Sequence, residues 1–207
     1  MMNGENIKSF SAKDLCCRSC MQIKMFNEHP ELRPQPNTNT NNGVSYQHTV
    51  ALKTDNVIGE EMRGSYCEDN IWINFSNDIV CNNKIIEVKS VNREVEKWYF
   101  ENSILQCAVY KALLHKSNKK LITSTFYVQM GNPLVETTVD NNTEYYLQFG
   151  EELYKIEVTN PDKIVKFLIS KAKASTDWTM ARDFDNKFKH KEYTELQDCF
   201  YFVKIEK

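Results

Sequence analysis

Two carboxylates and a lysine stand close together in one stretch of the chain, Ile71–Ser90. β-Branched and aromatic residues flank Asn82-Asn83, and asparagine tolerates the positive φ that a two-residue hairpin turn demands. The stretch therefore predicts two antiparallel strands. If the two asparagines form the turn, Asp78 lies directly opposite Glu87.

These residues have the chemistry of a cation site. Facing carboxylates on neighbouring strands repel each other, so Asp78 and Glu87 indicate a divalent cation that offsets their charge. Side chains alternate along a strand, which places Lys89 on the face of Glu87 and points Val88 into the core. Asp, Glu and Lys on one face of a hairpin predict a metal site beside a fixed positive charge.

Two helices are expected beside this hairpin. Arg93–Lys116 has a strong apolar face, and Gln106 and Tyr110 share one side of it because they are four residues apart. Gly43–Lys53 predicts a short helix that carries His48 on its apolar face. A lone histidine in such a place is more often a satisfied core residue than a ligand, so both interpretations stay open.

The rest of the pattern predicts an α/β fold, a mixed central β-sheet flanked by helices, in one domain spanning residues 1–207. A capping box of Ser11 and Asp14 begins a helix, and residues 29–42, with three Pro and four Asn, predict a mobile loop. Tyr145–Phe149 and Leu153–Val158 are expected to pair as a hairpin. The other expected helices are Ser11–Asn27, 161–174 and Asp177–Phe188, and the other expected strands are Val57–Cys67, Leu121–Met130, Leu134–Val139 and Cys199–Ile205.

Composition narrows the class of protein. The chain has 207 residues with net charge −2, so its overall field does not favour nucleic acid, although a local basic groove would suffice. Between Asn160 and Lys191, eight Lys or Arg face four Asp, which predicts either a solvated surface or one wall of a phosphate-binding groove. Seven cysteines, no signal-peptide core and no apolar run of about 20 residues predict a cytoplasmic protein with free thiols and no membrane role.

Taken together, the motifs resemble a known family. Asp78, then Glu87-Val88-Lys89, then Gln106-x-x-x-Tyr110 one helix later resemble the PD-(D/E)XK nuclease superfamily. The likeness is strongest to its RecB-like branch, which includes the CRISPR-associated adaptation exonucleases. His48 resembles the histidine of that branch's first motif, and the likeness spans roughly residues 11–113.

The resemblance implies a restriction-endonuclease-like core and a function. Mg²⁺ or Mn²⁺ would be held by Asp78, Glu87, the carbonyl of Val88 and His48. Lys89 would hold or help deprotonate the attacking water and stabilise the developing negative charge. Gln106 and Tyr110 would orient the substrate backbone or Lys89 (all six side chains belong to one expected site). The implied activity is hydrolysis of DNA phosphodiester bonds, more often from an end than internally, in defence, recombination or repair.

The chain departs from this family in its cysteines. Many relatives hold an iron–sulfur cluster with one early and three late cysteines, whereas here Cys16, Cys17 and Cys20 are early and Cys199 alone is late. A cluster needs four thiolates within reach, so none is expected and the early cysteines are interpreted as buried helix residues.

Three alternatives remain from the residues alone. The same site could act on RNA or cut internally. The chain could be a nucleic-acid-binding or partner-binding subunit, including a homo-oligomer, with little activity of its own. The acidic pair could also be accidental in an α/β protein, which the facing carboxylates argue against.

Overall fold

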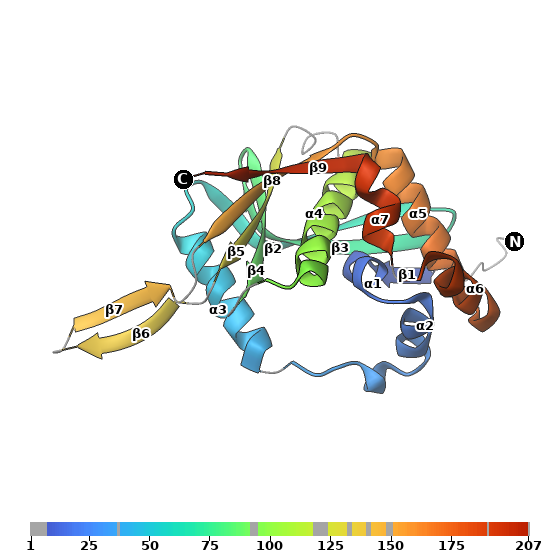
Figure 1. Ribbon diagram of the computed structural model, residues 1–207, viewed down its shortest axis with the longest axis horizontal. Coiled ribbons are helices and arrows are strands. Elements are labelled where there is room, and N and C mark those ends of the chain that lie inside the picture. Colours follow the sequence, from blue (N-terminus) through green and yellow to red (C-terminus); the bar gives the residue numbers. More distant parts are fainter. Residues whose placement is uncertain are drawn as a thin grey trace, which may run out of the picture.

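The computed structural model describes residues 8–36, 38–91, 95–117, 124–131, 134–139, 142–147, 151–189 and 191–206. The predicted α/β fold with a mixed sheet flanked by helices is confirmed (Figure 1). The strands are β1 Lys8–Ser11, β2 Val57–Glu68, β3 Ile71–Cys81, β4 Lys84–Ser90, β5 Thr125–Gly131, β6 Leu134–Val139, β7 Asn142–Leu147, β8 Glu152–Val158 and β9 Phe200–Ile205. The helices are α1 Ala12–Cys17, α2 Cys20–Glu28, α3 Thr38–Leu52, α4 Lys97–Ser117, α5 Pro161–Ala174, α6 Trp178–Phe188 and α7 Glu192–Leu196.

One sheet holds seven of the described strands in the order β1-β3-β4-β5-β8-β9, with β2 paired to the free edge of β3. β1 runs parallel to β3 and β4 runs parallel to β5, while the remaining neighbours are antiparallel. The meander β2–β3–β4 is as predicted, and its register is confirmed by the pairs Ile79–Ile86 and Val80–Ile85. Helix α4 connects the parallel strands β4 and β5, as such a crossover requires.

Helices cover both faces of the sheet, and β4 shows how. Ile86 and Val88 pack with Tyr46 and Val50 of α3. Glu87, between them in sequence, faces α4. Because successive side chains of a strand point to opposite faces, α3 and α4 lie on opposite sides of the sheet. Helix α4 is buried along most of its length between the sheet and α5.

The edge of β3 is shared by two strands, and this arrangement opens a fork. β1 pairs with the first part of β3 and ends where Ser11 meets Asn74. β4 pairs with the last part of β3 from Ile79 onwards. Phe75 to Asp78 therefore have no strand partner on that edge. Asp78 lies at the point where β3 and β4 separate.

The N-terminal helix differs from its prediction, because the chain breaks it at Arg18. The Asp14 carboxylate does not close a capping box with Ser11; it accepts from Arg18 Nε and Arg33 Nη1, each at 2.9 Å. A capping box does form, but between Ser19 and Gln22 at the start of α2. Two short helices replace the one predicted.

The predicted loop at residues 29–42 is wrong in its second half. A 3₁₀ turn covers Pro30–Leu32, and α3 begins at Thr38, so the expected helix is extended by five residues at its start. Residue 37 lies outside the described residues. Asn and Thr are poor helix formers, so the packing of the later part of α3 on the sheet outweighs their local preference.

The predicted pairing of the later strands is also wrong. β7 pairs with β6, from Leu134–Leu147 to Val139–Asn142, and β8 instead joins the main sheet between β5 and β9. Figure 1 shows β6 and β7 as a separate hairpin that projects from the body. Residues 148–150, where the turn was expected, lie outside the described residues.

The C-terminal helices follow the sequence closely. Asn160 caps α5, with Pro161 at the first helical position, and Asp177 caps α6. Among the described residues, no helix is both long and apolar enough to cross a lipid bilayer.

Candidate active site

The fork between β3 and β4 positions the two carboxylates. Where the strands separate, the side chain of Asp78 replaces the missing ladder bond: its Oδ2 accepts from the backbone N–H of Val88 at 2.8 Å. Glu87 is 3% exposed and points toward α4. Asp78 and Glu87 therefore stand next to the last strand pair, Ile79–Ile86, where the predicted register would bring them opposite each other.

A single hydrogen-bond network joins all of the predicted catalytic side chains except that of Asp78. Glu87 Oε1 accepts from Lys89 Nζ at 2.6 Å and from Gln106 Nε2 at 2.6 Å. Gln106 Oε1 accepts from Lys89 at 3.1 Å, and Gln106 Nε2 also lies 2.8 Å from the Tyr110 hydroxyl oxygen. Gln106 therefore fixes the positions of both Glu87 and Lys89. Tyr110, which is 4% exposed and packs against Phe75, closes the network from the core.

Burial sets the proton affinities of this network. Burial, with the nearby Asp78 charge, raises the pKa of Glu87 to about 7 although Lys89 opposes the shift. Burial also raises the pKa of Asp78, against the attraction of Lys89 and the bond from Val88. Burial lowers the pKa of Lys89, but the Glu87 and Asp78 carboxylates outweigh it and hold that pKa well above its usual range. Lys89 is a cation at neutral pH.

One oxygen of the Glu87 carboxylate fits the binding of a divalent cation. Glu87 Oε2 is buried and has no hydrogen-bond partner, which is costly for a carboxylate oxygen unless a cation or proton meets it. Oxygen ligands of this kind suit Mg²⁺ or Mn²⁺. Asp78 and Glu87 are the residues that would hold the ion. The side chain of Val88 packs in the core, as predicted, so only its backbone could contribute.

His48 is not part of this network. Its side chain is 62% exposed, on the solvent face of α3, and its Nδ1 lies 3.3 Å from Glu60 Oε1. The neighbouring Gln47 does reach the fork, because its Nε2 donates to the carbonyl of Asp78 at 3.3 Å. Within the described part of the chain, no three His, Cys, Asp or Glu side chains gather closely enough to hold a metal ion.

Three further residues at the fork were not predicted. Glu61 lies across β2 from Asp78, in a positive-φ conformation (51°) that few residues besides glycine adopt. Lys13 is exposed on α1 just after β1 ends, and its positive charge opposes the rise in the pKa of both Asp78 and Glu87. Tyr99 on α4 donates to the Ser90 carbonyl at 3.4 Å, and the charge of Lys89 opposes the rise in its pKa that burial causes. No sequence signal could have found them, since only the fold brings α1, β2 and α4 to one place.

The cysteines are free, and the prediction that the early three are buried in helices is confirmed for Cys16 and Cys20 but wrong for Cys17. Cys16 is buried in α1, Cys17 is exposed on the same helix, and Cys20 donates through Sγ to the Lys171 carbonyl at 3.7 Å. Cys199 is buried beside β9. Burial raises the pKa of the Cys16 and Cys20 thiols, which disfavours the thiolate form.

Comparison with known proteins identifies a shared fold. No protein-family model matches this chain, and no curated protein matches it. Among solved structures, the chain is similar to the protein SSO0001, known from "Crystal structure of SSO0001". The TM-score is 0.52 at 13% identity, over 83% of this chain and 79% of that one. Identity this low shows a common fold and nothing of activity.

Proposed function

We propose that this chain is a metal-dependent nuclease that hydrolyses phosphodiester bonds of DNA, with the restriction-endonuclease-like core of the PD-(D/E)XK superfamily. The observation that carries the proposal is the buried network of Glu87, Lys89 and Gln106 beside Asp78. A buried carboxylate oxygen without a partner destabilises a fold. Its place beside the fixed cation Lys89 supports a catalytic role.

Each residue of the network has a task in this proposal. Asp78 and Glu87 would hold Mg²⁺ or Mn²⁺, with the Val88 carbonyl and His48 as further proposed ligands. Such an ion supplies an activated water and offsets the charge of the phosphate. Lys89, kept protonated by its carboxylate neighbours, stabilises the negative charge that develops on the phosphate oxygens. Gln106 holds Lys89 and Glu87 in place, and Tyr110 holds Gln106.

A second candidate function is a nucleic-acid-binding subunit with the same fold and little activity. The position of His48 favours it, since this proposed ligand contacts Glu60 rather than the acidic pair. Calorimetry with Mn²⁺ separates the two proposals. Binding that Asp78→Asn abolishes supports the nuclease, and absence of binding supports the subunit.

The decisive test of the nuclease is a time course on end-labelled single-stranded and duplex DNA. Mg²⁺, Mn²⁺ or EDTA is added, and Asp78→Asn is compared with the wild type. Metal-dependent shortening that is lost in the variant is the expected result. Circular DNA separates cutting at ends from internal cutting, and RNA tests the substrate class. Failure of the wild type on all of these substrates would reject the proposal.

Metal affinity is expected to depend on pH because of Glu87. Its raised pKa of about 7 means that a proton occupies the carboxyl at lower pH and must leave before a cation binds. Mn²⁺ affinity should therefore rise about tenfold per pH unit toward about pH 7 and level off above it. Calorimetry from about pH 5.5 to about pH 8.5 measures this. The slope should disappear in Glu87→Gln; a wild-type affinity that is flat with pH would contradict the assignment.

Lys13 is expected to contact a phosphate of the substrate. It is a positive charge at the fork with no ion pair of its own among the described residues. Lys13→Ala should raise KM about tenfold, because one hydrogen bond to a charged group is lost, and should leave kcat nearly unchanged. Lys13→Arg should restore most of the loss. Lys8→Ala, an exposed lysine on β1, is the matched control, and an equal effect there would remove Lys13 from the site.

A further inference from the structure

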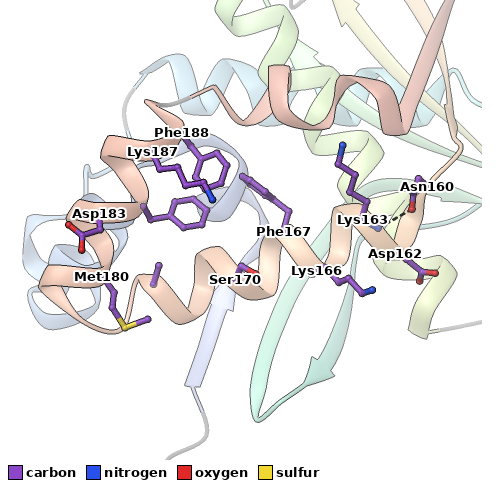
Figure 2. Close-up of a pocket in the computed structure, with 12 residues that line it drawn as sticks. Asn160, Asp162, Lys163, Lys166, Phe167, Ser170, Met180, Asp183, Lys187 and Phe188 are labelled. Carbon is purple, nitrogen blue, oxygen red and sulfur yellow. Dashed lines mark hydrogen bonds between the residues drawn. The ribbon is translucent and has the colours of Figure 1, made fainter.

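A groove runs between α5 and α6, and none of its lining residues belongs to the cleavage site. Its volume is about 840 Å³. Phe167 of α5 and Phe184 and Phe188 of α6 form its apolar floor. Figure 2 shows the side chains of Phe167 and Phe188 reaching toward each other from the two helices, with the Lys187 side chain beside them.

The floor is an aromatic cluster rather than a mixed apolar surface. The centres of the Phe184 and Phe188 rings lie 4.4 Å apart with the rings tilted, and the Phe167 ring packs edge-to-face at 5.6 Å from Phe184 and 5.3 Å from Phe188. Lys187 Nζ stands 4.9 Å from the centre of the Phe188 ring. All three rings are only partly buried. Partly exposed rings beside a cation can stack against flat, electron-rich groups.

The charges around the groove are unbalanced once existing contacts are counted. Of the four aspartates between Asn160 and Lys191, Asp162 pairs with Lys116, Asp177 caps α6, and Asp185 accepts from two backbone N–H groups of α2. Asp183 alone has no such contact among the described residues.

The basic residues of the same stretch differ in whether they already have a partner. Lys171 is buried, and Lys163 and Lys173 form ion pairs. Lys166 on one wall and Lys187 on the other form no ion pair in the described structure, although the charge of Lys166 also acts on Asp162, which is paired with Lys116. Arg182 and Lys189 are exposed nearby in sequence and are also unpaired there. The surface therefore carries a positive surplus that an anionic ligand would complement.

We propose that the α5–α6 groove binds single-stranded nucleic acid, with bases against the three phenylalanines and phosphates at Lys166 and Lys187. An aromatic floor between cationic walls is the arrangement by which proteins hold single strands without reading their sequence. A duplex hides its base faces and could use only the lysines. The groove is a second site, and its function is independent of whether the fork between β3 and β4 cuts DNA.

The test is fluorescence anisotropy of a labelled oligothymidylate of about 16 nucleotides in EDTA, where no metal-dependent cleavage occurs. Lys166→Glu/Lys187→Glu should weaken binding by more than about tenfold. It should also reduce the slope of log affinity against log salt by roughly 1.4, about 0.7 for each lost phosphate contact. Lys8→Glu/Lys53→Glu, with the same charge change at exposed lysines on β1 and after α3, should leave binding within about twofold of the wild type.

Phe184→Ala separates stacking from charge. It should weaken binding about tenfold with an unchanged salt slope, since one stacking partner is lost and no cation is. A thermal melt shows that the variant is folded. Equal losses in the groove and control variants, or no loss in either, would overturn the proposal. So would tight binding of an acidic amphipathic peptide in place of the oligonucleotide.

The outcomes for the two sites can be told apart. If the chain cleaves DNA but the groove variants bind as the wild type does, the groove proposal alone fails. If the oligonucleotide binds at the groove but nothing is cleaved, the nuclease proposal fails and the groove stands.

Discussion

Lys89→Ala is expected to reduce DNA cleavage by at least about 10³-fold, because it removes the buried cation that we propose contacts the substrate at the fork. Lys89 Nζ touches Glu87 and Gln106, and its side chain is 13% exposed. A positive charge in such a place acts on the scissile phosphate with little screening by water. The interaction lost with Lys89 stabilises the transition state, so kcat should fall more than KM rises.

The fold should survive this substitution. Without Lys89, the buried carboxyl of Glu87 would lie beside Asp78 alone, and its already raised pKa would rise further. The group would then take up a proton and become neutral, which limits the cost of burial. Gln106 would still donate to it.

The measurement is single-turnover cleavage with saturating Mn²⁺, alongside a thermal melt. Lys8→Ala serves as the control for loss of a surface lysine on a neighbouring strand. A folded Lys89→Ala protein that still cleaves at near wild-type rate would show that the fork between β3 and β4 is not the catalytic site.

Lys171→Met is expected to destabilise the protein by about 3–5 kcal/mol, because it breaks a fully buried ion pair. Lys171 is 0% exposed; its Nζ donates to Glu192 Oε1 at 2.6 Å and to the Leu15 carbonyl at 2.8 Å. These two bonds tie α5 to α1 and α7. Removal of the lysine leaves a largely buried carboxylate and a backbone carbonyl without their donor.

The expected melting temperature is lower by about 10 °C, from about 2–4 °C per kcal/mol for a chain of this size. Lys171→Met/Glu192→Leu should recover most of that loss, since no charge then remains buried. Lys163→Met, which breaks the exposed pair with Asp198, is the control and should change the melting temperature little. A double variant as unstable as Lys171→Met would show that the carbonyl of Leu15, not Glu192, is the partner that matters.

Local chemistry is what the sequence by itself determined. The two-residue Asn82-Asn83 loop fixed the register of β3 and β4, because it leaves one way for the strands to pair. The positive φ expected of these two asparagines is wrong, since neither adopts it. The positions of Glu87 and Lys89 follow from alternation along β4. Gln106 and Tyr110 meet because residues four apart share a helix face. The caps of α5 and α6 could likewise be predicted from Asn160 and Asp177.

Only the tertiary structure decided contacts between distant segments. The fork exists because β1 takes half the edge of β3, and no spacing within Ile71–Ser90 contains that information. Asp14 does not form the expected capping box because Arg33, nineteen residues later, binds its carboxylate. β8 is held between β5 and β9, and β7 pairs with β6 instead. His48 faces solvent because Tyr46 and Val50 occupy the face of α3 that packs on β4. The sequence could therefore name the reactive groups, whereas Lys13, Glu61 and the α5–α6 groove required the packed molecule.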